Sequence, residues 1–283
     1  MGSVIDCPPN IVMEHRTLSS RAAPFILAAA FGPKFFAIGS KLFKSVKMVK
    51  AGLAGASVVA YSWLFSWEFA LIIIFSLVIH EYGHVWAMRA VGIPTKGFYL
   101  IPFVGGAAVP ERAFASRLEE HFVAIAGPVF GLAQAVFLYG LFVIYEHPFL
   151  GAVAAWIAVL NLFNMIPITP LDGGRIVKSA TMSVAPGVGM TVLMLGIFAA
   201  ITLMFWLRSW VLALVVLVSV FEFMVERRTH RFTPDPYLKR MTPGQTGWCL
   251  ASYVAVVAAL ALITYGCLSI PEARLAMTIL SDG

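Results

Sequence analysis

Charged residues are scarce in this chain of 283 residues. Asp, Glu, Lys and Arg make up 12% of the sequence, whereas 60% of the residues are apolar and the mean hydropathy is +0.88. A soluble domain carries roughly 25% charged residues. The composition therefore excludes an ordinary soluble domain and predicts a protein of the lipid bilayer.

Cysteines are also few, and their positions exclude a disulfide framework. Cys249 and Cys267 lie near opposite ends of one predicted helix, too far apart to bond to each other, and Cys7 is remote from both. The closely spaced cysteine pairs of a structural zinc site are lacking as well. Any metal must therefore be bound by histidines and carboxylates.

The chain offers no extended polar region that could fold alone. A spanning helix needs about 20 mostly apolar residues. Such stretches occur at about residues 49–67, 69–91, 120–145, 149–167, 188–207, 209–226 and 248–268. They predict an all-α integral membrane protein, a bundle of six to seven transmembrane helices.

We expect three parts along the chain. Residues 1–48 form an amino-terminal cytoplasmic or interfacial segment, in which residues 22–39 lie on the membrane or re-enter it because prolines interrupt them. Residues 49–226 form the transmembrane core. Residues 227–283 form a basic cytoplasmic link, a last transmembrane helix and a short tail.

Acidic residues are absent between Glu14 and Glu68, whereas five lysines lie before or at the start of the first predicted span. Lysines and arginines favour cytoplasmic links. With the amino terminus in the cytoplasm, most basic residues face that side, and only Arg208 and Arg274 fall outside. Topology and anionic lipids thus account for the net charge of +6, without nucleic acid. We expect a multi-pass protein of a bacterial cell membrane.

Ionisable residues gather inside one predicted span, at His80-Glu81-Tyr82-Gly83-His84. Histidines at positions i and i+4 share one face of a helix, with rings about 6 Å apart, and suit a single zinc ion. Glu81 then lies beside the metal, where it can take a proton from bound water. Because buried ionisable groups are costly in a membrane, this pattern favours a catalytic metal site over histidines that merely bridge helices.

Asp172 is the leading candidate for the third ligand that a catalytic zinc requires. It follows Pro167 and Pro170, which end a spanning helix near membrane depth, where irregular backbone is tolerated only beside protein or a cavity. Asn164 could line that cavity and bind substrate, or bridge two helices. Other candidate ligands lie near span ends, where we expect them to reach water: Glu119, Glu120, His121 and Glu222.

These two motifs together resemble the site-2 protease family of intramembrane zinc metalloproteases, peptidase family M50. The resemblance implies that His80, His84 and Asp172 bind zinc and that Glu81 is the general base. It covers roughly residues 50–225 and includes Phe103-Val104-Gly105-Gly106 and Ala126-Gly127-Pro128. The chain departs from the family at Gly131, where the family often has Asn.

Residues 97–110 place aromatic and β-branched side chains around Gly105 and Gly106. This pattern predicts a small re-entrant β-hairpin near the active site, although a plain connecting loop is an alternative. An extended peptide could pair with the exposed edge of such a hairpin. We therefore expect Gly105 and Gly106, together with Asn164, to bind substrate.

The predicted function is regulated intramembrane proteolysis by a metalloendopeptidase with one zinc ion per chain. Its expected partners are the lipid bilayer and a membrane-anchored protein whose transmembrane segment is cut, with no nucleic acid; the sequence does not indicate an oligomeric state. One alternative is a membrane metalloprotease that takes Glu222 as third ligand and cleaves outside the bilayer. Another is a non-catalytic scaffold or transporter that uses the intramembrane polar residues.

Overall fold

The computed structural model describes residues 46–64, 67–101, 105–208, 210–228 and 238–268. The chain divides into two compact units, Met1–Val49 and Lys50–Gly283, and only residues 46–49 of the first are described. The fold set out here is therefore that of the second unit. Residues 22–39, Phe103, Val104 and most of the basic link after residue 228 lie outside the described residues, and the three-part division stays a prediction.

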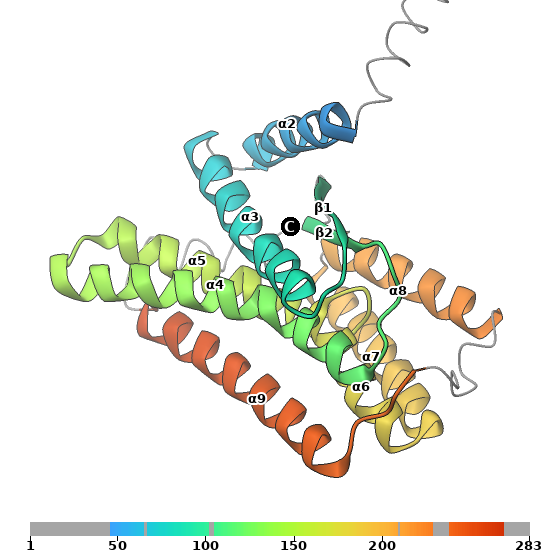
Figure 1. Cartoon of the computed structure of the whole chain (residues 1–283). Coiled ribbons are helices and arrows are strands. Elements are labelled where there is room, and N and C mark those ends of the chain that lie inside the picture. Colours follow the sequence, from blue (N-terminus) through green and yellow to red (C-terminus); the bar gives the residue numbers. More distant parts are fainter. Residues whose placement is uncertain (1–45, 65–66, 102–104, 209, 229–237, 269–283) are drawn as a thin grey trace, which may run out of the picture. The chain divides into compact units, whose positions relative to one another are not determined.

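Helices make up most of the described chain, as Figure 1 shows. The long helix α4 (Arg117–Tyr145) is central, because α3 (Trp67–Ala90), α5 (Pro148–Asn164), α6 (Asp172–Val184) and α9 (Pro243–Gly266) all pack against it. Helix α7 (Pro186–Leu207) contacts α6 and α8 (Trp210–Arg228), and α2 (Val46–Leu64) precedes α3.

Four described helices are long and apolar enough to cross a membrane: Phe69–Ala90, Arg117–Tyr145, Pro186–Trp206 and Pro243–Gly266. The prediction of a mostly helical membrane protein is confirmed, but the count of six to seven spans is not. The apolar helices Pro148–Asn164 and Leu212–Met224 are shorter. Helix α5 stops at Asn164, three residues before Pro167, because proline cannot continue the helical hydrogen bonding.

The predicted β-hairpin is present. Strands β1 (Thr95–Ile101) and β2 (Gly105–Pro110) pair antiparallel, with Leu100 opposite Gly106. Both strands pack on α3, and Leu100 is buried with Ile73 and Leu77 of that helix. The hairpin is thereby fixed over the helix that carries the histidine motif.

The apolar pattern does not predict helix α6, because its 13 residues are too few to span a membrane and include Arg175 and Lys178. It begins at Asp172, after the irregular residues 165–171. Three neighbouring helices contact that segment. Ile168 and Leu171 pack into a cluster with residues of α7 and α8, and the Tyr253 hydroxyl of α9 donates a hydrogen bond of 2.7 Å to the Met165 carbonyl.

Candidate metal centre

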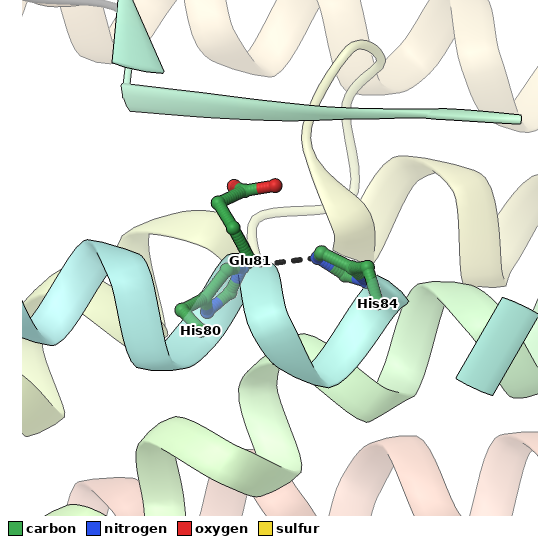
Figure 2. A group of neighbouring side chains, drawn as sticks. All are labelled: His80, Glu81 and His84. Atoms are coloured by element: carbon green, nitrogen blue, oxygen red, sulfur yellow. Dashed lines mark hydrogen bonds between the residues drawn. The ribbon is translucent and has the colours of Figure 1, made fainter. Parts of the chain in front are cut away.

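Helix α3 places His80, Glu81 and His84 together within the protein interior. Their exposed fractions are 3%, 4% and 5%, and one ligand atom from each lies within 4.8 Å of the others. Figure 2 shows the two imidazole rings one turn apart, while Glu81 extends toward a neighbouring strand. The predicted one-face arrangement of the motif is therefore what the helix produces.

Both histidine rings are held with their Nε2 atoms facing the cluster. The His80 Nδ1 lies 2.8 Å from the Asn161 Oδ1, and the His84 Nδ1 lies 2.7 Å from the Val123 carbonyl oxygen. These partners only accept hydrogen bonds, so each Nδ1 must carry the proton and donate it. Each Nε2 then keeps a lone pair, which is the tautomer that a metal ligand needs.

Asp172 joins the two histidines from the start of α6. Its Oδ2 lies 3.0 Å from the His80 Nε2 and 3.2 Å from the His84 Nε2, and the two Nε2 atoms are 3.2 Å apart. In a tetrahedral zinc site with bonds of about 2.0–2.1 Å, ligand atoms stand about 3.3 Å apart. The structure thus brings all three predicted ligands into a triangle of the size that zinc requires.

Two further observations fit a metal ion with an attached water. A Cβ added at Gly127 of α4 would collide with the His84 Nε2 and lie 2.8 Å from the His80 Nε2, so only glycine leaves room for both ligand atoms. The Glu81 Oε2 is buried and has no hydrogen-bond partner among the described residues. A buried carboxylate oxygen needs a partner, and a water at the metal would supply a donor.

The predicted substrate-binding residues lie around this cluster. The Asn164 Nδ2 is 3.5 Å from the His80 Nε2, at the end of α5. A Cβ added at Gly106 of β2 would collide with the Glu81 carboxyl group, so the strand passes directly over that side chain. Gly105 precedes it with a φ of 107°, in the region that favours glycine.

Asn161 is a residue of this site that the sequence analysis does not single out. It is 2% exposed, and its Oδ1 binds His80 while its Nδ2 donates a 2.8 Å hydrogen bond to the Ile157 carbonyl. Its amide fills the space beside Gly131, where a Cβ would collide with it. One feature of the sequence could have identified it: Asn161 lies one helical turn before Asn164, so both amides share one face of α5.

Replacing Asn161 with Ala should weaken zinc binding by about 10- to 100-fold, because His80 loses the partner that fixes its tautomer. Asn164→Ala is the matched control, since that amide is not bonded to a ring Nδ1, and its zinc affinity should stay close to that of the wild type. Competition with a fluorescent zinc chelator measures both affinities. Wild-type affinity in Asn161→Ala would contradict the positioning role.

The other candidate ligands stay outside the cluster. His121 is 4% exposed rather than reaching water as expected, because α9 covers it: its Nδ1 lies 3.0 Å from the Cys249 Sγ and its Nε2 lies 3.2 Å from the Ser252 Oγ. Glu119 caps the start of α4 through the Ala115 N–H, at 2.9 Å. Glu120 forms an ion pair of 2.7 Å with Arg117. Glu222 lines a cavity next to His84.

Fold and site together define a mostly helical protein with helices that are long and apolar enough to cross a membrane, and with a buried His-Glu-x-x-His cluster that could hold a metal ion. Residues 68–155, which carry the histidine motif, match the family model of peptidase family M50, the family that the motifs resemble. Asp172 lies beyond the matched residues.

Three relatives are similar to this chain. A Synechocystis sp. protein with the provisional name of zinc metalloprotease is 36% identical over 125 residues, which are 41% of this chain and 32% of the relative. A zinc metalloprotease of Methanocaldococcus jannaschii is 28% identical over 172 residues, 56% of this chain and 48% of the relative. The stage IV sporulation protein FB of Bacillus subtilis is 28% identical over 165 residues, 54% of this chain and 57% of the relative.

The chain therefore spans about a third to somewhat over half of the length of these relatives. Two of the three names contain zinc metalloprotease, and the described cluster is one that could hold a metal ion. Both findings agree with the prediction of a metal site at this cluster.

Proposed function

We propose that this protein is a zinc-dependent endopeptidase that cuts membrane-anchored proteins within or near their transmembrane segments. The observation that carries the proposal is the convergence of His80, His84 and Asp172 beside a buried, unpartnered Glu81 oxygen, inside a bundle of membrane helices. Buried ionisable groups in such helices are retained where they serve a function. The site is proposed to bind one zinc ion per chain.

His80, His84 and Asp172 would hold the metal and leave its fourth position open. Zinc, when bound, would lower the pKa of a water toward about 7 and polarise a peptide carbonyl. Glu81 would accept the proton of that water at its free Oε2 and pass it to the amine that leaves. The Asn161 amide and the Val123 carbonyl would keep both imidazole rings oriented throughout.

Strand β2 is proposed to hold the substrate. Its pairing with β1 uses one edge, and no described residue pairs with the other edge. A peptide that adds there as a further strand has its backbone hydrogen bonds satisfied, and Gly106 would bring it next to Glu81. Because a helix shields its carbonyls, the substrate must first unwind locally, so helix-destabilising residues should favour cleavage.

The proposed setting follows from the helices and from charge. The chain would be a multi-pass protein of a bacterial cell membrane with its amino terminus in the cytoplasm, since its lysines and arginines gather in links on that side. Its partners would be the bilayer and a protein with a transmembrane helix.

Cleavage of a single-span reporter protein in liposomes, with the cut position read by mass spectrometry, tests the proposal. We expect a cut within the transmembrane segment or a few residues from it, sensitive to a zinc chelator. Cuts confined to a distant soluble part of the reporter would favour a protease that acts outside the bilayer. No cleavage by zinc-loaded protein would favour a scaffold or transporter.

A further inference from the structure

A cavity of about 360 Å³ adjoins the metal centre at His84. Helices α3, α4, α6 and α8 and strand β2 contribute its walls. It is not purely apolar, because four charged side chains line it: Glu120, Arg175, Lys178 and Glu222. A chain bound along β2 would have this cavity beside it, since Ala108 and Pro110 of that strand are also lining residues.

Three of these charges already have partners. Glu120 is bound to Arg117 at 2.7 Å, and Lys178 and Glu222 both take part in interactions. Arg175 differs, since its guanidinium is exposed and has no hydrogen bond or ion pair within the described part of the chain. The cavity therefore presents one cationic group that is available to a ligand.

Arg175 stands close to the chemistry. It follows Asp172 by three residues on α6, so both side chains occupy one face of that helix. A planar guanidinium binds a carboxylate through two parallel hydrogen bonds, a geometry that an apolar or amide side chain cannot reproduce.

We propose that Arg175 is a specificity residue, which selects substrates with an Asp or Glu side chain within a few residues of the scissile bond. This inference rests on the proposed peptidase function and adds a chemical class of substrate to it. The acidic side chain would enter the cavity while the peptide lies along β2. A basic residue at the same place would be repelled.

Reporter substrates that carry Asp, Asn or Lys, scanned over five positions on either side of the cut, test the proposal in liposomes. For the wild type we expect one position at which Asp gives about a 10-fold higher kcat/KM than Asn, since charged hydrogen bonds contribute that much in partly exposed sites. Arg175→Gln should reduce the ratio to about 1, and Arg175→Glu should make Lys the preferred residue.

Arg89→Gln is the matched control, because Arg89 is an exposed arginine of α3 that does not line the cavity, and its Asp preference should equal that of the wild type. Zinc content verifies that each variant is folded. The inference is overturned if the wild type shows no preference at any position, or if the preference survives in Arg175→Gln. It is also overturned if Arg175→Gln slows all substrates equally. A wild type that cleaves none of them would sink the proposed function as well.

Discussion

Glu81→Gln should lower peptide-bond cleavage on the order of 1,000-fold, because an amide cannot take a proton from water and the general base is lost. Zinc should remain bound, since His80, His84 and Asp172 converge without needing the Glu81 carboxylate, whose Oε2 is unpartnered. Gln has nearly the size of Glu, so β2 can still pass over it. Single-turnover cleavage of a liposome reporter, with zinc content determined on the same sample, measures both effects.

Glu111→Gln provides the control for the lost negative charge. Glu111 is exposed and follows β2, away from the metal cluster. The Glu111→Gln variant should cleave the reporter at the wild-type rate. Substantial cleavage by Glu81→Gln would show that another group takes the proton.

Gly127→Ala should lose zinc affinity on the order of 100-fold, and activity with it. The added Cβ would occupy the space of the His84 Nε2 and crowd the His80 Nε2. Neither ring can turn away without losing a hydrogen bond, because Asn161 and Val123 accept from the Nδ1 atoms of His80 and His84. Displaced ligands bind metal weakly, since affinity depends on their orientation. Isothermal titration of the metal-free protein with zinc measures the loss.

Gly140→Ala is the matched substitution on the same helix. A Cβ at Gly140 meets no atom within 4 Å, so zinc affinity should be unchanged and helix propensity slightly improved. Circular dichroism shows whether both variants keep their helices. Wild-type zinc affinity in a folded Gly127→Ala would contradict the close approach of α4 to the ligands.

The metal-binding pattern could be predicted because its parts are local in sequence. The spacing of His80 and His84 sets their common face once α3 is helical, and the cost of ionisable groups in lipid implies a partner. Asp172 could be predicted as a ligand because it follows prolines that end the preceding span near membrane depth. These are properties of single segments, and in the structure the three side chains come within 3.0–3.2 Å of one another.

Contacts between segments could not be predicted in the same way. Asn161 orients His80 across 81 positions of sequence, and Gly127 is required by rings that belong to another helix. The unpaired state of Arg175 likewise depends on which neighbours α6 meets. The predicted number of spans is not confirmed, because hydropathy does not show that α5 ends at Asn164 and has only 17 residues.

Zinc content of the purified protein, determined by mass spectrometry of the metal for the wild type and Asp172→Ala, tests the central claim most directly. The site described here predicts about one zinc per wild-type chain and loss of most of it in the variant, because one of three protein ligands is removed. Full zinc in a folded Asp172→Ala would contradict the claim and favour Glu222 as the third ligand. A wild type without zinc affinity would refute the metal centre itself.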